Sequence, residues 1–439
     1  MELSVIILAA GKGTRMKSVL PKVMQPLAGK PLLAHVLATA QELQSSRTIV
    51  VYGHGGEVVQ KHFAHQENLA WALQAEQKGT GHAVQMALSQ LPETGKTLIL
   101  YGDVPLTTPE TLQKLLDLVV DNQKIALLTV NLANPTGYGR IVREAGLVQR
   151  IVEQKDANEQ EKQITEVNTG ILCVPNCHLH QWLPTLKNNN AQGEYYLTDV
   201  IALAVQQGLT VNTYQPQAAW EVEGINDKLQ LSTLERVYQR LQAENLMRAG
   251  ATIIDPARFD MRGTATIGMD VFFDANVLLE GDNHFGNGVK VGTNCVIKNC
   301  KIADGVEIRA NSVLEDAEIG QNAQIGPFAR IRPQSKIGAN VHIGNFVETK
   351  NTIMADGAKA NHLAYLGDSE VGERSNIGAG TITCNYDGAN KFKTIIGADA
   401  FIGSNSSLIA PVVIGDGATT GAGSAISKDV PANHLAVAR

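Results

Sequence analysis

The segment IGQNAQIGPFARIRPQSKIGANVHIG, residues 319–344, carries an isoleucine at every sixth position from Ile319 to Ile343. An α-helix repeats about every 3.6 residues and a strand about every two, so neither accounts for this period. A β-solenoid does, because each hexad supplies a short strand, a turn and one aliphatic side chain that points into a narrow core. Three hexads make one triangular coil of about 18 residues, and coils stack at roughly 4.8 Å. The period therefore predicts a β-helix.

The six-residue period extends well beyond this segment. It returns over residues 396–426, in Ile396, Ile402, Leu408, Ile414, Thr420 and Ile426. It lapses over residues 343–371 and again over residues 377–396. We expect each lapse to be a segment pushed out of the coil as a loop, and loops on a rigid scaffold often carry chemistry.

The N-terminal half is organised differently, because short apolar runs alternate with amphipathic stretches. The runs are Ser4–Leu8, Thr48–Tyr52, Thr97–Tyr101, Ile125–Val130 and Gly170–Val174. Alternation at this spacing is typical of βα units and predicts an α/β, Rossmann-like domain with a mostly parallel sheet. Ligands of such sheets bind at the carboxyl ends of the strands.

Residues 227–249 have the pattern of a single helix, with Asn226 as a cap and Gly250 as its end. At about 1.5 Å per residue, such a helix is long enough to carry the chain to a separate domain. We expect an α/β domain over residues 1–226, a linker helix over 227–250 and a β-helix domain over 251–439.

Composition and charge exclude several classes of partner. A formal net charge of −6 gives no overall field for attracting nucleic acid or anionic lipid. The N-terminal apolar run is too short for a signal peptide, and no stretch is long enough to span a bilayer. Five scattered cysteines fit a reducing compartment. We therefore expect a cytoplasmic protein without nucleic-acid or membrane partners.

One group of cysteines and histidines invites a metal interpretation. Cys173 and Cys177 lie close in sequence to His178 and His180. Cys173, however, lies within an apolar, strand-like run, and no second ligand pair has the spacing of a zinc site. We expect Cys173 to be a small buried hydrophobic residue.

A glycine-rich loop, LAAGKGTRM over residues 8–16, follows the first apolar run. Gly11 and Gly13 let the backbone approach a phosphate chain, while Lys12 and Arg15 add positive charge. Gly-x-Gly alone is a weak signal, and the third glycine of the dinucleotide fingerprint is replaced by Met16. The loop is a candidate nucleotide site.

Three further clusters support this interpretation. Lys22 lies near the same loop, and Gly79 opens the turn GTGHA, whose amides suit a base or a sugar edge. Asp103 ends an apolar strand, where a lone carboxylate is costly unless it binds a metal or another cation. The alternative for Asp103 is a helix cap or a turn residue.

The lapses in the β-helix period contain the polar motifs of the second half. The first lapse includes NHLAYLGD over residues 361–368, and the second includes NYDGANK over residues 385–391. A neutral imidazole suits general-base work near neutral pH. Of the 11 histidines, His362 is the preferred base because it lies in a lapse beside other polar residues. The histidines interpreted as structural or solvated are His35, His62, His65 and His342.

These motifs resemble a known family. LAAGKGTRM, Pro21-Lys22, GTGHA and YGD are similar to nucleotidyltransferases that join a sugar 1-phosphate to a nucleoside triphosphate. Together with the hexapeptide half, nearly the whole chain resembles the bacterial bifunctional N-acetylglucosamine-1-phosphate uridylyltransferase/glucosamine-1-phosphate acetyltransferases. The resemblance implies a left-handed parallel β-helix that transfers acetyl from acetyl-CoA to glucosamine-1-phosphate. It also implies that the first domain couples the product to UTP, giving UDP-N-acetylglucosamine and pyrophosphate.

The resemblance also implies the residues of the uridylyl-transfer site. Arg15 and Lys22 would meet the phosphates and act in catalysis, while Asp103 and Asn226 would hold Mg²⁺. The residues implied to contact the uridine, the phosphates or the N-acetylglucosamine moiety are Leu8, Ala9, Ala10, Gly11, Lys22, Gln74, Gly79, Thr80, Tyr101, Gly102, Asp103, Gly139, Glu153, Asn168 and Asn226.

For the acetyl-transfer site, the resemblance implies His362 as the base and a homotrimer as the assembly. Glucosamine-1-phosphate would be held by Arg332, Lys350, Tyr365, Asn376, Asn385 and Tyr386. Acetyl-CoA would be contacted by Ala379, Ser404, Ala422 and Arg439, with the Ala379 amide as an oxyanion donor. The sequence departs from the family at Ala364, where Thr is frequent. The given sequence stops at Arg439, where the family usually continues with a short basic tail.

Two alternatives stay open at this point. One is a single-activity sugar-phosphate nucleotidyltransferase whose β-helix is structural or regulatory. The polar motifs around His362 and Asn385 argue against it, because a purely structural prism has no need of them. The other is an acyltransferase with a vestigial nucleotide domain, against which Lys22 and Asp103 argue.

Overall fold

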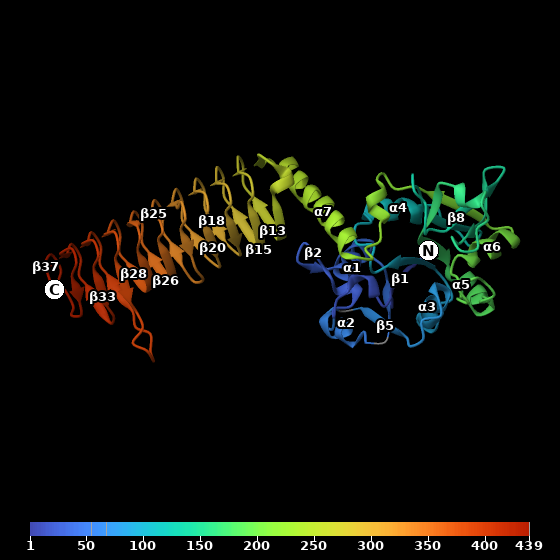
Figure 1. The fold of residues 1–439 in the computed structure, drawn as a ribbon, viewed down its shortest axis with the longest axis horizontal. Coiled ribbons are helices and arrows are strands. Elements are labelled where there is room, and N and C mark those ends of the chain that lie inside the picture. The colour runs from blue at the N-terminus through green and yellow to red at the C-terminus, as the bar shows by residue number, and fades with distance from the viewer. Residues whose placement is uncertain (54, 67, 439) are drawn as a thin grey trace. The chain divides into compact units, whose positions relative to one another are not determined.

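A computed structural model describes residues 1–53, 55–66 and 68–438 of the chain (Figure 1). It contains two compact units, Met1–Glu235 and Arg236–Arg439, and each is described by itself. The helix expected over residues 227–249 is α7, Lys228–Arg248, and the division between the units falls within it. Arg439 lies outside the described residues. Among the described residues, no helix combines the length and the apolar character that crossing a bilayer requires.

Unit 1 is built on one large sheet with the strand order β11-β7-β10-β6-β1-β4-β5 and the hairpin β8-β9 beside β10. Its strands are β1 (Leu3–Ala9), β4 (Arg47–Gly53), β5 (Leu69–Gln74), β6 (Lys96–Tyr101), β7 (Lys124–Asn131), β8 (Arg140–Glu144), β9 (Leu147–Val152), β10 (Glu166–Pro175) and β11 (Thr210–Tyr214). The five apolar runs of the sequence all fall in these strands. The expected parallel sheet is confirmed in its centre, where β1 pairs with β4 and β6. The exceptions are β10, which runs antiparallel to both β6 and β7, and the hairpin β8-β9, whose two strands are antiparallel.

Helices cover both faces of this sheet, as expected for a doubly covered α/β domain. On β1, Val5 and Ile7 belong to one apolar core, and Ile6 and Leu8 belong to the other. Successive residues of a strand point to opposite faces, so a continuous apolar run serves both cores. The helices of the unit are α1 (Leu32–Glu42), α2 (Glu57–His62), α3 (Thr80–Ala87), α4 (Pro109–Asp117), α5 (Asn176–Trp182) and α6 (Asp199–Gln206). A small hairpin, β2 (Pro26–Leu27) and β3 (Lys30–Pro31), precedes α1.

Unit 2 is the predicted left-handed β-helix, whose coils follow one another along a single axis in Figure 1. One face is the sheet of β12 (Thr252–Ile253), β14 (Phe272–Phe273), β16 (Lys290–Val291), β19 (Glu307–Ile308), β22 (Gln324–Ile325), β25 (His342–Asn345), β27 (Lys359–His362), β29 (Asn376–Ile377), β32 (Phe401–Ile402), β35 (Thr419–Thr420) and β37 (Leu435–Ala436). The remaining strands are β13 (Asp260–Ile267), β15 (Leu278–Phe285), β17 (Val296–Lys298), β18 (Lys301–Ile302), β20 (Val313–Glu315), β21 (Glu318–Ile319), β23 (Arg330–Ile331), β24 (Lys336–Ile337), β26 (Glu348–Met354), β28 (Tyr365–Val371), β30 (Ile382–Cys384), β31 (Thr394–Ile396), β33 (Ser407–Ile409), β34 (Val412–Ile414) and β36 (Ala425–Ile426).

The aliphatic residues of the six-residue period form the core of this unit. All of those in residues 319–344 are at most 3% exposed. Parallel pairing stacks Ile325 on Ile343 and Ile319 on Ile337, one coil apart. Each buried side chain thus packs against its own counterpart in the next coil, which is why the period is so regular in sequence.

The two lapses have different structures. The first was expected to be a loop, and this was wrong: β25, β26, β27 and β28 continue the coils without interruption. Ile343 pairs with Ala360, 17 residues on, so the lapse is a coil one residue shorter than the 18 between Ile325 and Ile343. The second lapse does contain a projecting loop. The next partner of Ile377 is Ile402, 25 residues on, and the added residues form a hairpin closed by a bridge between Tyr386 and Lys391.

One edge of the β-helix is a column of residues in the left-handed conformation. Asn276, Asn294 and Asn311 occupy it first, and asparagine tolerates a positive φ well. Phe328, Phe346 and Leu363 follow with φ values of 56°, 58° and 52°, and Gly380, Asn405 and Gly423 complete the column. A bulky residue pays a conformational penalty in this region. We call Phe328, Phe346 and Leu363 the apolar corner.

Candidate active sites

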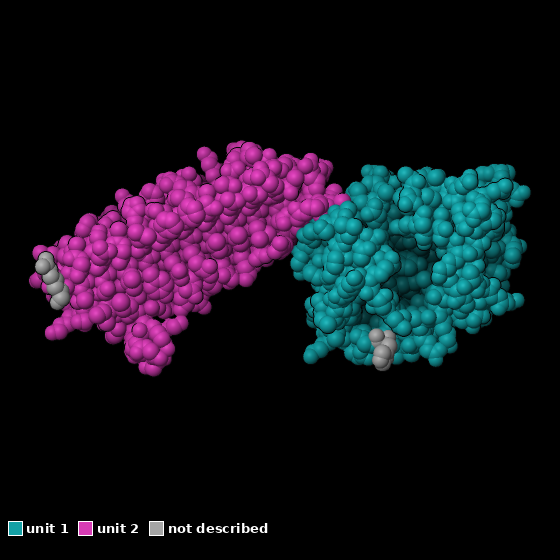
Figure 2. All heavy atoms as spheres, in the orientation of Figure 1, with its two compact units in different colours: residues 1–235 teal, residues 236–439 magenta. Residues whose placement is uncertain are grey.

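Unit 1 contains a cavity of about 240 Å³ at the carboxyl ends of its central strands. Figure 2 shows unit 1 in teal, with its visible face hollowed. Ten of the residues expected to contact substrate line this cavity, from β1 and the glycine-rich loop, Lys22, β5, α3 and the end of β6. They are Leu8, Ala9, Ala10, Gly11, Lys22, Gln74, Gly79, Thr80, Tyr101 and Asp103.

A cation held by two oxygen acceptors lies at the edge of the cavity. The Lys22 ammonium donates to the Asp103 carboxylate and, at 3.2 Å, to the amide oxygen of Asn226. The backbone brings these residues together, because the Ile225 amide donates to the Asp103 carbonyl at 2.9 Å. The Lys22 and Asp103 side chains are only 14% and 15% exposed. Asp103 thus lies in the turn that follows β6, and its carboxylate is paired with a cation there.

The glycine-rich loop packs closely over Lys22. Gly13 has a φ of 59°, and a Cβ added to it would lie 2.7 Å from the Lys22 Cβ. A side chain at Gly13 would thus displace the lysine, which explains why this position requires glycine. Arg15, in the short 3-10 turn Thr14–Met16, is exposed and lines none of the cavities described for this unit. The structure does not bring Arg15 together with the other expected residues.

A second group of expected residues surrounds Tyr101, behind the cavity. The backbone N–H of Asn168 donates to the Gly139 carbonyl at 2.8 Å. A Cβ on Gly139 would lie 3.4 Å from the Glu153 carboxylate. Burial raises the pKa of Glu153, although a hydrogen bond from Thr198 opposes the shift. Burial also raises the pKa of Tyr101, and the carboxylates of Asp103 and Glu153 add to that shift.

Sequence reasoning missed several residues of this site. Gln77 donates a hydrogen bond to the Ala10 carbonyl and lines the cavity. Glu194 also lines the cavity. Gly170 has a φ of 86°, and a Cβ on it would lie 2.5 Å from the Tyr101 ring. The sequence places Gln77 beside the GTGHA turn, which was a usable signal. It gave none for Glu194, whose proximity depends on the fold. Gly102, by contrast, was expected, and its amide donates to the Leu8 carbonyl at 2.9 Å.

In unit 2, His362 and three residues expected to contact acetyl-CoA lie on one edge. The amides of Gly380, Asn405 and Gly423 donate one coil back, to the carbonyls of His362, Ala379 and Ser404. This register places His362, Ala379, Ser404 and Ala422 in one column, each directly before a residue of the left-handed column. In the described part of the chain, the Ala379 N–H has no acceptor. The column offers an exposed track beside His362.

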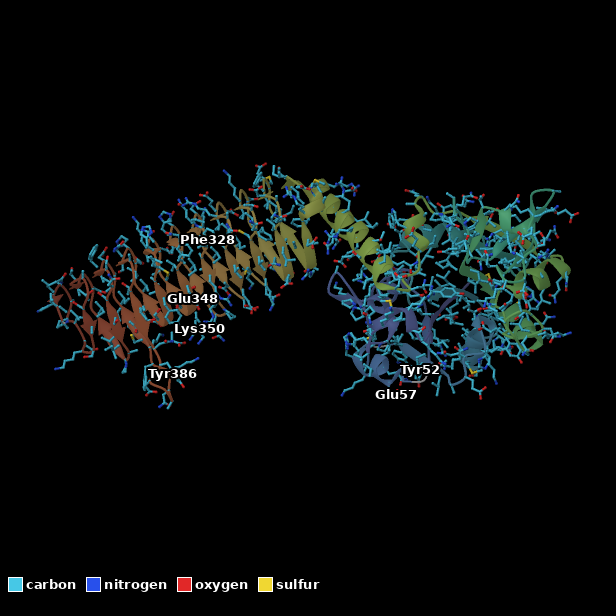
Figure 3. The ribbon with its side chains drawn as sticks, in the orientation of Figure 1. Tyr52, Glu57, Phe328, Glu348, Lys350 and Tyr386 are labelled. Atoms are coloured by element: carbon cyan, nitrogen blue, oxygen red, sulfur yellow. The ribbon has the colours of Figure 1, made fainter. Side chains whose placement is uncertain are left out.

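Most of the residues expected to hold a sugar phosphate lie on the next face of the β-helix, whereas Asn376, in β29, belongs to the same sheet as His362 in β27. Arg332 donates to Glu348 at 2.7 Å, and Lys350 lies 3.8 Å from the Asp368 carboxylate. Asn385 donates to the same carboxylate. In Figure 3, Glu348 and Lys350 lie on the side of the β-helix from which the hairpin with Tyr386 projects. Tyr365 and Asn376 are half-buried in β28 and β29, and Tyr365 pairs in register with Glu348.

Lys391, at the end of the hairpin, was missed as a site residue. Its ammonium lowers the pKa of Lys350, with partial burial and Arg332 acting in the same direction and Asp368 against it. Three cations, Arg332, Lys350 and Lys391, thus lie near two carboxylates, Glu348 and Asp368, which leaves an excess of positive charge. Such a region favours an anionic ligand.

The metal interpretation of the cysteine and histidine group finds no support in the contacts of its members. Cys173 is buried in β10, as expected, and Cys177 is exposed. His178 and His180 each hydrogen-bond a backbone carbonyl, of Asn122 and of Leu91. The structure therefore holds these side chains apart in separate roles.

Comparison with known proteins places the chain in a family. Residues 5–163 match the family described as MobA-like NTP transferase domain. Residues 316–351 and 393–428 match bacterial transferase hexapeptide repeats. The chain is 60% identical over 439 residues to the bifunctional protein GlmU of Acinetobacter baylyi, covering 100% of this chain and 96% of that protein. It is 56% identical over 439 residues to the one of Marinobacter nauticus, with the same coverage.

The chain belongs to the family of bifunctional GlmU proteins.

The family resemblance seen in the sequence is therefore confirmed, and so are both halves of the fold. The protein is a bifunctional enzyme of UDP-N-acetylglucosamine synthesis that uses acetyl-CoA and UTP as substrates. The single-activity alternative is not favoured, because the relatives are similar over both units. Among solved structures, the chain is similar to a UDP-glucose pyrophosphorylase complexed with UDP-glucose, with a TM-score of 0.44 and 17% identity over 54% of this chain and 98% of that one.

Proposed function

We propose that the cavity of unit 1 is the uridylyl-transfer site and that the His362 edge of unit 2 is the acetyl-transfer site. The observation that carries this assignment is the cluster of Lys22, Asp103 and Asn226 at the cavity edge. It places a cation and two oxygen atoms that can bind a metal ion beside a loop whose glycines let a phosphate chain approach. The second unit carries a histidine beside an exposed track and a separate group of cations.

The donor set at the cavity edge fits Mg²⁺. A carboxylate and an amide oxygen converge on one position, and they already hold a cation there, the Lys22 ammonium. Mg²⁺ binds through one or two such oxygens together with substrate phosphates. When bound, it would neutralise the charge that builds up on the phosphates of UTP.

Uridylyl transfer needs positioning and charge neutralisation more than proton transfer. The phosphate of a sugar 1-phosphate is largely dianionic at neutral pH, because its second pKa is near 6. One of its oxygens attacks the α-phosphorus of UTP, the bond to the β-phosphate oxygen breaks, and pyrophosphate leaves. Lys22, next to the metal ligands, would bind the reacting phosphates. Arg15 would reach them from the exposed end of the glycine-rich loop.

Acetyl transfer needs a base, because an ammonium group has no lone pair with which to attack. His362 would accept the proton from the amine of glucosamine-1-phosphate as its nitrogen attacks the thioester carbonyl. The Ala379 N–H would stabilise the oxyanion. The C–S bond then breaks, and the CoA thiolate leaves and takes up a proton. Arg332, Lys350 and Lys391 would hold the phosphate of the acceptor.

The test of the two-step function is an assay of the wild-type chain with acetyl-CoA, UTP, Mg²⁺ and glucosamine-1-phosphate together. We expect CoA and pyrophosphate to be released in sequence and UDP-N-acetylglucosamine to accumulate. Omitting acetyl-CoA should stop pyrophosphate release unless N-acetylglucosamine-1-phosphate is supplied. Pyrophosphate release from glucosamine-1-phosphate alone, at the full rate, would contradict this order of steps.

We also place both reactions in the cytoplasm. The five cysteines are all free, and three of them are buried, which suits a reducing compartment.

The assembly that we propose is a homotrimer in which the apolar corner contacts a second copy of the chain. Phe328, Phe346 and Leu363 are 49%, 55% and 62% exposed, and the two phenylalanine rings stack with centroids 5.4 Å apart. Each adopts a left-handed conformation that costs about 1–3 kcal/mol. Coils before and after this segment use Asn or Gly at the same positions. An exposed apolar strip kept at a conformational cost is explained by burial against another chain.

Replacing Phe328, Phe346 and Leu363 together by Asn should therefore dissociate the assembly without unfolding the protomer. Asn is the residue that other coils use at this edge, so the variant relieves strain while it removes apolar area. Light scattering should show a mass near the 47.0 kDa of one chain. When the variant and the wild type are compared as monomers at low concentration, the thermal midpoint of the variant should not be the lower one. The control is Met269→Gln, which alters an exposed apolar residue elsewhere in unit 2. A trimer that survives the triple change would contradict the proposed contact.

Binding of glucosamine-1-phosphate should be accompanied by proton uptake at alkaline pH. The neighbouring Lys391 lowers the pKa of Lys350 in the free protein, so some Lys350 is neutral when the pH approaches that lowered pKa. A bound phosphate dianion favours the ammonium form and raises this pKa again. Calorimetry at about pH 9 in buffers of different ionisation enthalpy measures the uptake. Lys391→Ala removes the main cause of the lowered Lys350 pKa and should reduce the proton uptake. Equal uptake by this variant and the wild type would contradict the assignment.

A further inference from the structure

Asn345 holds the His362 imidazole from the coil below. The Oδ1 atom of Asn345 lies 2.9 Å from Nδ1 of His362. The two residues are opposite each other in the parallel pairing of β25 with β27. The backbone reinforces this pairing, since the Leu363 amide donates to the Asn345 carbonyl at 3.1 Å. The position of Asn345 relative to His362 is therefore set by the ladder of the β-helix itself.

We propose that Asn345 is a positioning residue for acetyl transfer, which selects the tautomer of His362. The inference rests on the proposed role of His362 as the base. An amide oxygen accepts the Nδ1–H of a neutral imidazole, so the lone pair is left on Nε2. Nε2 is then the atom that accepts the proton from the attacking amine. The same contact fixes the rotation of the ring, because Nδ1 must face the coil below.

An amide suits this task for an electrostatic reason. A carboxylate at the same place would stabilise the imidazolium, the form of the ring that cannot act as a base. The amide oxygen of Asn345 orients the ring without adding a charge. Without any acceptor, the ring would rotate and would populate both tautomers, and only one of them presents a lone pair to the substrate.

The experiment compares Asn345→Leu with Asn345→Asp in the full-length protein. Leu has nearly the shape of Asn but no acceptor, whereas Asp keeps an oxygen at the same distance. We expect Asn345→Leu to lower kcat for acetyl transfer by about 10–100-fold, the range seen when a partner that orients a histidine is lost. The KM values for acetyl-CoA and glucosamine-1-phosphate should stay within about twofold, because the proposed role of Asn345 is exerted on the imidazole ring and not on either substrate. Asn345→Asp should recover most of the lost kcat at alkaline pH, where an imidazole beside a carboxylate is neutral as well.

Three controls separate this role from a structural one. Asn361→Leu alters the same residue type next to His362, on the same strand β27, and should leave acetyl transfer unchanged. Uridylyl transfer, measured on the same samples, should be unaffected in every variant. Circular dichroism melting should give equal thermal midpoints for Asn345→Leu and Asn345→Asp.

The possible results are distinct. Full acetyl transfer by Asn345→Leu would overturn the proposal, and so would equal losses in the Leu and Asp variants at alkaline pH or a loss confined to KM. His362→Ala tests the underlying assignment separately. If His362→Ala abolishes acetyl transfer while Asn345→Leu retains it, the base is correct and the positioning residue is not.

Discussion

Replacing His362 by alanine is expected to lower acetyl transfer by about 10²–10⁴-fold, the range that general-base catalysis contributes. The amine of glucosamine-1-phosphate must lose a proton to attack, and His362 is the imidazole on the edge that also carries Ala379, Ser404 and Ala422. Release of the CoA thiol, followed with a thiol reagent at saturating substrates, measures the effect. The KM values should change little, because the ring acts on the proton rather than on the binding of either substrate.

Uridylyl transfer in the same variant should equal that of the wild type. The two units fold as separate compact bodies with cores of their own, so a change on the β-helix edge leaves the cavity of unit 1 intact. A matched control is His342→Ala, which alters a partly buried histidine of β25 that the proposed chemistry does not use. If His362→Ala loses both activities while it stays folded, the two-site assignment is wrong.

Replacing Asp103 by alanine is expected to have the opposite pattern, with uridylyl transfer lowered by about 10²–10³-fold or more and acetyl transfer unchanged. The carboxylate would supply one of two oxygens for Mg²⁺, whose neutralisation of phosphate charge is worth several kcal/mol, and about 1.4 kcal/mol corresponds to a tenfold change. Pyrophosphate release from UTP and N-acetylglucosamine-1-phosphate measures the loss. Its dependence on Mg²⁺ concentration should shift to higher values.

Asp103 also accepts a hydrogen bond from Lys22, so a second variant is needed to separate the metal from the lysine. Asn226→Ala removes the other oxygen but leaves the Lys22–Asp103 pair, and it should also raise the Mg²⁺ requirement. Asp117→Ala is the control, since that exposed carboxylate of unit 1 lies at the end of α4 and is not one of the expected site residues. An unchanged Mg²⁺ requirement in both Asp103→Ala and Asn226→Ala would contradict the proposed metal site.

Much of the fold was predictable because its signals are local. The isoleucines from Ile319 to Ile343 are buried as expected, and the strand after which the glycine-rich loop begins is where the apolar run predicted it. The antiparallel course of β10 was not predictable, because an apolar run has no direction. The first lapse was misinterpreted for a related reason: Ala360 keeps its place in the core although it breaks the aliphatic pattern.

The candidate sites were predictable to different degrees. Asp103 follows the end of β6, where ligands of such sheets bind, and Lys22 was expected near the glycine-rich loop; the structure brings the two side chains into contact. Asn226 is distant in sequence, and only the family resemblance indicated it. Arg15 stands apart from the cavity in the structure, although it shares the loop with Gly11. Lys391 ends the motif NYDGANK but was not singled out within it, and Asn345 carried no signal of its own.

The sequence by itself determined the two-unit organisation, the β-helix core and the nucleotide-type loop, because periodicity and strand-end motifs depend only on neighbouring residues. Only the tertiary structure decided which side chains of different coils meet. A coil of 18 residues would set Gly344 opposite His362, whereas the observed coil of 17 sets Asn345 there. The left-handed conformations of Phe328, Phe346 and Leu363 likewise arise from the corner of the prism, since nothing in the preferences of these residues favours them.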